Sequence, residues 1–207
     1  MGDFSLSSLE LDAMNEIGNV ATGNAATALS KFLNKNVGMN LPETVFVPLG
    51  QFAEHLGGPE KVVSAIYLHV EGDLEGEVTF VFPKEGALEL VDLAIGNPPG
   101  TTKVLEGMEE SAFKEISNIL TGAFLNALSR MLDVTILPSI PHTATDMAQA
   151  LMDFMLAKVG RYADDIFLVK TKINVEGHNV DGDFIVVFDK QSLKSIITRL
   201  HTKYGVL

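Results

Sequence analysis

The first stretch of the chain carries apolar residues at intervals of three or four positions. Ser7 and Glu10 fit a capping box at its start, and Asn34 to Asn36 with Gly38 are typical of a helix stop. The apolar positions are Leu6, Leu9, Ala13, Ile17, Val20, Ala21, Ala28 and Phe32. Because this spacing forms one apolar stripe on a helical surface, the pattern predicts a single long helix from about Ser8 to Leu33.

The remainder of the first half alternates between short apolar runs and turn residues. Residues 45–47, Val-Phe-Val, lie between two prolines, which is typical of an edge strand or a strand start. Gly96 to Gly100, with two prolines inside it, is the strongest loop signal and marks the middle of the chain. The pattern predicts, in order, a strand at 41–49, a helical turn at 51–56, a hairpin of 61–70 and 76–82, and a helix at 85–95.

The second half repeats this order with one addition. The repeated elements are a long helix at 107–132, a strand-like segment at 134–137, a hairpin of 165–175 and 182–188, and a closing helix at 191–202. The addition is a Met-rich amphipathic helix expected at Thr145 to Val159, which has no good match in the first half.

Residue identities repeat as well as the pattern. A shift of 99 residues carries Glu16 to Glu115, Asn19 to Asn118, Thr22 to Thr121, Gly23 to Gly122 and Pro42 to Pro141. We therefore expect a single domain over residues 1–207, made of two homologous halves at about 1–97 and 101–207. One half alone would leave sheet edges unpaired. The predicted fold class is α+β: internally duplicated and pseudo-twofold, with long helices packed on a shared, mostly antiparallel β-sheet.

Composition and charge narrow the classes of function. The 207 residues include no cysteine, which excludes disulfides and thiolate metal sites. No apolar run is long enough for a membrane helix, and no secretory signal is recognisable at the N-terminus; we expect a cytoplasmic protein. The net charge of −12 argues against nucleic acid and anionic membranes as partners. Solubility explains such a charge, as does a basic partner or a nearby cation.

The repeated helix carries a polar stripe opposite its apolar face. At about 100° per residue, the four stripe positions fall within about 60° of one another. They are Asp12, Glu16, Asn19 and Gly23 in the first half, and Ser111, Glu115, Asn118 and Gly122 in the second. A solvated helix face is the simple alternative. However, Asn and mid-helix Gly weaken a helix, the latter by about 1 kcal/mol relative to Ala, and the whole set recurs. A glycine there is useful where another group approaches closely.

A Glu and an Asn three residues apart on a helix can reach one target together. The amide can hold a water by donating and accepting hydrogen bonds, although it cannot act as a base at neutral pH. The carboxylate can bind a cation or a lysine. This combination suits the orientation of a water that attacks a substrate carrying its own activating metal, as in phosphoryl transfer.

The full motif resembles that of the CheC/CheX/FliY phosphatases of bacterial and archaeal chemotaxis. The pattern is Asp or Ser, three residues, Glu, two residues, Asn, twenty-two residues and Pro. It is met by Asp12–Glu16–Asn19–Pro42 and by Ser111–Glu115–Asn118–Pro141, and neither copy departs from it. The resemblance covers essentially the whole chain. Two complete copies, the length and the absence of an appended flagellar-switch domain make the chain most similar to the CheC members.

The resemblance implies hydrolysis of the phospho-aspartate of the response regulator CheY. It assigns Glu16 and Glu115 to gripping a lysine of the regulator, and Asn19 and Asn118 to positioning the attacking water. It implies no cofactor or metal ligand of the protein's own, because the Mg²⁺ belongs to the bound regulator. Asp12 and Ser111 are supporting motif positions. Pro42 and Pro141 are expected to be structural, since each fixes φ where a strand begins.

The resemblance also implies binding of CheD, a receptor glutamine deamidase. It places this contact on the additional helix near Thr145 to Val159, with Asp146 and Met147 as candidate residues; core packing is the alternative role of the Met residues there. A non-catalytic adaptor that sequesters CheD is therefore the main rival function, and a structural flagellar-switch component is a third. The histidines are scattered without metal-ligand spacing: His55, His69, His142, His178 and His201.

Overall fold

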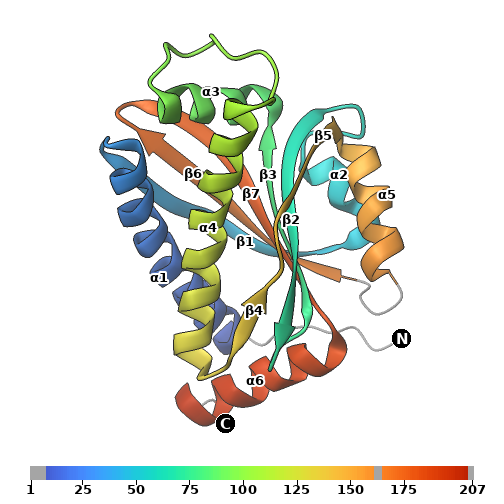
Figure 1. The fold of residues 1–207 in the computed structure, drawn as a ribbon. Coiled ribbons are helices and arrows are strands. Elements are labelled where there is room, and N and C mark those ends of the chain that lie inside the picture. Colours follow the sequence, from blue (N-terminus) through green and yellow to red (C-terminus); the bar gives the residue numbers. More distant parts are fainter. Residues whose placement is uncertain (1–7, 161–164, 205–207) are drawn as a thin grey trace.

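The computed structural model describes residues 8–160 and 165–204 (Figure 1). The helices are α1 (Ser8–Leu33), α2 (Phe52–His55) after a 3₁₀ turn at Leu49–Gln51, α3 (Lys84–Ile95), α4 (Met108–Leu132), α5 (Ala148–Val159) and α6 (Lys190–Tyr204). The strands are β1 (Val37–Pro48), β2 (Val62–Gly72), β3 (Gly76–Pro83), β4 (Ile136–Pro138), β5 (His142–Met147), β6 (Asp165–Val175) and β7 (His178–Phe188). The mixed helix and antiparallel-sheet class predicted from the sequence is confirmed. Ser7 of the predicted capping box lies outside the described residues.

Within the described residues, seven strands form one antiparallel sheet in the order β1-β6-β7-β3-β2-β4. Strand β5 pairs with β2 on the same edge as β4, along a different part of β2. The pairing of β3 with β7 joins the two hairpins at the centre. Each edge strand pairs with the hairpin of the other half: β1 with β6, and β4 and β5 with β2. The strand order is therefore symmetric about the sheet centre. The organisation in two homologous halves stays a prediction from the repeats.

Helices cover both faces of this sheet, and each face has its own core. Along β7, Phe184, Val186 and Phe188 point into the larger core with α1, α3, α4 and α6. The alternate residues Ile185 and Val187 point into the smaller core, which α2 and α5 cover. Strict alternation of this kind is the consequence of the two-residue period of a strand buried on both faces. Within the described residues, no helix is long and apolar enough to cross a membrane.

The long helices α1 and α4 lie side by side on the larger core and run in opposite directions (Figure 1). Ile17 and Ile116, which are fully buried, anchor the two helices on the sheet. Ile17 and Ala21 of the predicted apolar stripe are buried, together with Ala25 and Leu29. Val20 and Phe32, which were also assigned to that stripe, are exposed, so this part of the prediction is wrong.

The second edge of the sheet differs from the sequence-based prediction. The Met-rich helix was expected to begin at Thr145, but residues 142–147 form strand β5 and α5 begins at Ala148. Asp146 and Met147 therefore lie on a strand, not on the helix to which they were assigned. The prolines at 138 and 141 interrupt the local strand pattern, and only the long-range pairing with β2 defines β5.

Candidate functional site

Both Glu/Asn pairs lie on the outer faces of the long helices. Glu16 and Asn19 are exposed on α1, and Glu115 and Asn118 are exposed on α4. Each pair belongs to the half of its helix that comes first in the chain. Helices α1 and α4 are antiparallel (Figure 1), so the order from Glu to Asn runs in opposite directions in the two pairs.

The side chains of the second pair contact each other. The amide Nδ2 of Asn118 donates to Oε2 of Glu115 at 3.4 Å, a long hydrogen bond between residues three apart. Among the described side chains, Glu16 and Asn19 make no corresponding bond with each other. A contact this weak leaves the carboxylate and the amide available to a partner.

The stripe glycines Gly23 and Gly122 face open space. A Cβ built at either position has no heavy atom within 4 Å outside its own helix turn. The close approach expected from the sequence therefore does not occur within this chain. The flat surface beside each Glu/Asn pair is accessible to another molecule.

The first motif position is occupied differently in the two halves. Asp12 is exposed on α1. Ser111 is also exposed, but its hydroxyl donates to the backbone carbonyl of Gly107 at 2.9 Å, one turn earlier. The same carbonyl accepts the backbone amide of Ser111 at 3.2 Å, so the hydroxyl of Ser111 bonds back to its own helix.

The motif prolines fall at matching breaks in the two edge strands. The β1–β6 register shifts between Asn40 and Glu43, and this interval contains Pro42. Pro141 lies between the end of β4 and the start of β5, where the pairing with β2 is also interrupted. A proline has no N–H to donate to a strand ladder, so an irregular edge accommodates it. Pro42 thus lies inside β1 and not where a strand begins, as was expected, whereas Pro141 directly precedes β5.

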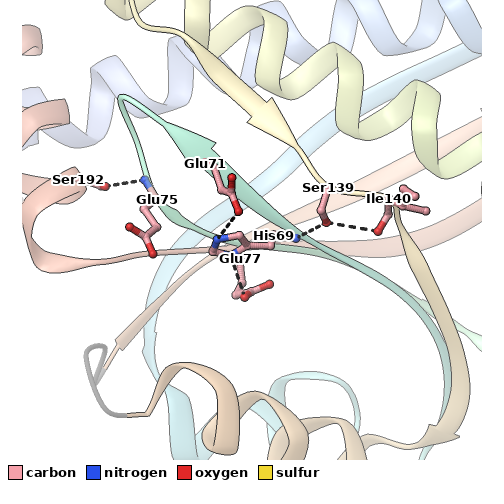
Figure 2. Close-up of polar contacts among 7 residues, drawn as sticks. All are labelled: His69, Glu71, Glu75, Glu77, Ser139, Ile140 and Ser192. Atoms are coloured by element: carbon pink, nitrogen blue, oxygen red, sulfur yellow. Dashed lines mark hydrogen bonds and ion pairs between the residues drawn. The ribbon is translucent and has the colours of Figure 1, made fainter.

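Ser139 secures the break beside Pro141 (Figure 2). Its amide donates to the carbonyl of His69 at 2.8 Å, and its hydroxyl accepts the amide of His69 at 3.0 Å. The imidazole of His69 contacts Glu77 at 3.1 Å and Glu71 at 3.8 Å. Within this arrangement Ile140 is directed outward and is 81% exposed. His69 is thus held at the sheet edge by contacts of its ring with two carboxylates and by backbone hydrogen bonds.

A polar network that the sequence analysis missed lies one turn before the second pair. Lys114 Nζ contacts Glu110 Oε1 at 2.6 Å, and Thr143 of β5 donates to the same oxygen at 3.2 Å. These hydrogen bonds, from Lys114 and then from Thr143, hold the pKa of Glu110 below its ordinary value. The spacing of four residues between Glu110 and Lys114 was the available sequence signal.

The same network borders a cleft of about 330 Å³ beside the start of α4. Its lining is partly polar and includes the hydroxyls of Ser64 and Thr145, which lie 2.9 Å apart. Lys84, Glu106 and Glu110 lie on its walls. The Glu/Asn pairs do not line this cleft and lie on exposed helical surfaces.

The residues proposed for CheD binding are exposed on β5. Asp146 accepts the backbone amide of Met147 at 2.8 Å, and Met147 is 47% exposed. Met152 and Met155 of α5 are buried in the smaller core. The packing alternative therefore describes these two methionines, whereas Met147 is accessible.

The described residues contain no group of three His, Asp or Glu side chains arranged to hold a metal ion. The histidines make local contacts instead. His178 contacts Glu89 at 2.7 Å, and His142 stacks on Tyr67 with ring centroids 5.3 Å apart. The site thus consists of carboxylates and amides presented outward, an arrangement suited to a protein partner that brings its own reactive centre.

Known proteins resemble this chain in both sequence and fold. A sequence profile described as the CheC-like family matches residues 9–45 and 108–143, which hold both Glu/Asn pairs and both motif prolines. The CheY-P phosphatase CheC of Bacillus subtilis (strain 168) is 30% identical over 171 residues, which cover 82% of each chain. The flagellar motor switch phosphatase FliY of the same organism is 29% identical over 198 residues, covering 94% of this chain and 50% of FliY.

The fold is also that of a solved relative. The X-ray crystal structure of Thermotoga maritima FliY superposes with a TM-score of 0.78 at 23% identity, covering 97% of this chain and 100% of that chain. The identity to Bacillus subtilis CheC extends across most of both chains, and the profile matches at both copies of the motif. This chain belongs to the CheC-like family.

Proposed function

We propose that this protein is a phosphatase that hydrolyses the phospho-aspartate of the chemotaxis response regulator CheY. The observation that carries the proposal is the exposure of two Glu/Asn pairs on adjacent helices, inside the two segments that match the family. The name of the Bacillus subtilis relative, a CheY-P phosphatase, supports the choice of substrate.

In the proposed reaction the carboxylate of Glu16 or Glu115 binds a lysine beside the regulator's phospho-aspartate. The neighbouring Asn19 or Asn118 hydrogen-bonds a water and aims its oxygen at the phosphorus. The water forms the new P–O bond as the bond to the aspartate oxygen breaks, which yields aspartate and inorganic phosphate. Mg²⁺ bound by the regulator neutralises charge on the phosphoryl oxygens.

The open position of both pairs fits this chemistry. A receiver domain supplies the metal, the phosphoryl group and most of the enclosing walls. The phosphatase then needs to contribute only docking and the orientation of one water, and positioning of this kind supplies much of the catalysis in phosphoryl transfer. An exposed helix face can enter such a site, whereas a residue in a closed pocket could not.

The experiment is the measurement of phosphate release from phosphorylated CheY. The double variants E16A/N19A and E115A/N118A each remove one pair, and their combination removes both. We expect each double variant to retain part of the activity and the combination to fall to the intrinsic decay rate of the regulator. Decay that stays fast in the combined variant would show that neither pair is catalytic.

The two members of a pair have separable roles. In a background with one active pair, Asn→Ala should lower kcat by about 10² because the water loses its orientation. Glu→Ala should act mainly on KM because docking weakens. Asn24→Ala on α1 and Asn126→Ala on α4 are matched controls, since both asparagines are exposed on the same helices outside the pairs.

The alternative function is a non-catalytic adaptor that binds CheD. The specific observation in its favour is the exposure of Asp146 and Met147 on β5, next to a cavity of about 190 Å³ lined by Tyr67, Leu151 and Phe154. D146A and M147A should weaken CheD binding if this surface is used. Tight CheD binding by a protein without any effect on phospho-aspartate decay would favour the adaptor.

A further inference from the structure

The side chain of Lys114 is placed beside the second Glu/Asn pair. Lys114 directly precedes Glu115 and lies four residues before Asn118, a spacing that brings the Cβ atoms within about 5–6 Å on one helix surface. Its side chain is 42% exposed. Between Lys103 and Arg130 the sequence contains no other Lys or Arg. The positive charge next to this pair therefore comes from a single residue of α4.

Two neighbours hold this ammonium in place. Glu110 accepts from Nζ of Lys114 at 2.6 Å, and Thr143 on β5 donates to the same carboxylate oxygen at 3.2 Å. The hydrogen bonds from Lys114 and Thr143 keep the pKa of Glu110 below its ordinary value. The carboxylate thus stays ionised near neutral pH, and it keeps Lys114 on the side of α4 that faces β5.

The first half has no counterpart of this network. The shift of 99 residues places Asn15 at the position of Lys114 and Leu11 at that of Glu110. No Lys or Arg occurs among residues 1–30. The two Glu/Asn pairs, which share their motif residues, therefore differ in local charge.

We propose that Lys114 is a specificity-determining residue of the Glu115/Asn118 site, where its ammonium contacts the anionic, phosphoryl-bearing pocket of the receiver domain. This inference rests on the proposed phosphatase function. A phosphoryl group carries close to two negative charges at neutral pH, and lysine binds phosphate as a flexible point charge. In the free protein the ammonium of Lys114 is bound by Glu110. On docking, the ammonium leaves Glu110 and binds the phosphoryl group. The second site consequently captures the phosphorylated regulator at a lower KM than the first.

The test uses the E16A/N19A variant, in which only the second site works, and phosphorylated CheY as substrate. K114M should raise KM about five- to tenfold with kcat within about twofold, and should flatten the dependence on salt, as expected for the loss of a charge at a docking surface. K114R should retain the low KM. E110Q breaks the same ion pair but leaves the ammonium, so its KM should stay equal or fall.

The reciprocal variant adds the charge to the other site. In E115A/N118A, where only the first site works, N15K should lower KM severalfold. Equal increases of KM in K114M and E110Q would overturn the inference, because the ion pair would then serve the structure of α4 alone. An unchanged KM in K114M, with normal phosphate release, would also overturn it while leaving the proposed function intact. Absence of phosphate release from the unmodified protein would overturn the proposed function and this inference together.

Discussion

Thr22 and Thr121 occupy corresponding positions on the two long helices, but only the hydroxyl of Thr22 has an acceptor. Thr22 Oγ1 donates to the backbone carbonyl of Gly18 at 2.7 Å. Thr121 Oγ1 is buried and has no hydrogen-bond partner among the described residues. Thr22 also lines a cavity of about 30 Å³ between α1, α4 and the sheet. Equivalent residues of the two motif helices thus make unequal contributions to stability.

Opposite changes in stability are expected when each threonine is replaced by the isosteric valine. T121V removes a buried hydroxyl that lacks a partner, so the free energy of unfolding should rise by about 1 kcal/mol. T22V removes a satisfied hydrogen bond, and the free energy of unfolding should fall by about 0.5–1 kcal/mol. Urea denaturation of both variants measures the difference. A loss of stability in T121V would mean that its hydroxyl has a partner, such as an internal water.

Elements with strong local patterns were predicted closely from the sequence. The long helix expected at Ser8 to Leu33 has these bounds in the structure, and the hairpin strands lie within about two residues of the expected positions at most ends. The Glu and Asn candidates on each long helix are exposed, as their position opposite the apolar residues indicated. Helical periodicity and hairpin turns are local properties, which a single sequence records directly.

Features that depend on distant pairing were not predicted. Strand β5 is defined by its register with β2, for example Ser64 opposite Thr145, and the hydroxyls of these residues lie 2.9 Å apart. The exchange of edge strands between halves and the contact of Thr143 with Glu110 arise in the same way. No local pattern encodes these contacts, because the partners are tens of residues apart. In addition, Pro141 directly before β5 weakens the local strand pattern.

Asp92 should make stability depend on pH at the acidic end. Its carboxylate is fully buried and accepts the Thr102 hydroxyl at 2.6 Å and the amides of Thr101 and Thr102 at 2.9 and 3.0 Å. Burial by itself raises the pKa of Asp92, but these hydrogen bonds outweigh it and lower the pKa below 3.8. The stabilisation is therefore complete above pH ~4, the ordinary range of an aspartate, and is lost as the pH falls through the lowered value.

The variant D92N should lower the free energy of unfolding at pH 7 by about 2–3 kcal/mol, because one carboxylate oxygen becomes an NH₂ that faces hydrogen-bond donors. D92N should also remove part of the loss of stability that the unmodified protein shows on acidification. Glu85→Gln, an exposed position on the same helix α3, is the matched control and should change stability by less than about 0.5 kcal/mol. Equal stability of D92N and the control would show that the hydrogen bonds of Asp92 to Thr101 and Thr102 contribute little to folding.

Asp183 should make stability depend on pH in the opposite direction, over a higher pH range. Burial raises the pKa of Asp183 from 3.8 to about 6, against the attraction of Lys170 and with the help of Asp181. Between these values the unfolded carboxyl is ionised and the folded one is protonated, so stability falls as the pH rises from about 4 to 6. The shift corresponds to about 3 kcal/mol at most.

D183N should therefore be more stable than the unmodified protein at pH 7 and should lose the decline between pH 4 and 6. Asp181 has a side chain that is 71% exposed, and D181N should keep most of that decline, because burial is the main cause of the raised pKa of Asp183. Thermal or urea unfolding across this pH range distinguishes the two variants. A decline that persists in D183N would assign the titration to another group.

Substitutions of the glycines beside the Glu/Asn pairs should affect stability and phosphate release in different ways. Gly23 and Gly122 lie in helix interiors with open space above them, so no contact in this chain requires a glycine there. Replacing either by Ala should raise the free energy of unfolding by about 1 kcal/mol, the helix propensity difference between the two residues.

A longer side chain at the same positions should obstruct a docking partner without harming the fold. G23Q and G122Q should fold at least as stably as the unmodified protein, because Gln is also a better helix former than Gly. Each should nevertheless weaken phosphate release at its own site, most clearly when the other pair is removed, since the receiver can no longer approach the helix backbone. N126Q, one turn beyond Gly122 on the exposed face of α4, is the control and should leave release unchanged. Full activity in G23Q and G122Q would place the docking surface elsewhere, whatever the gain in stability.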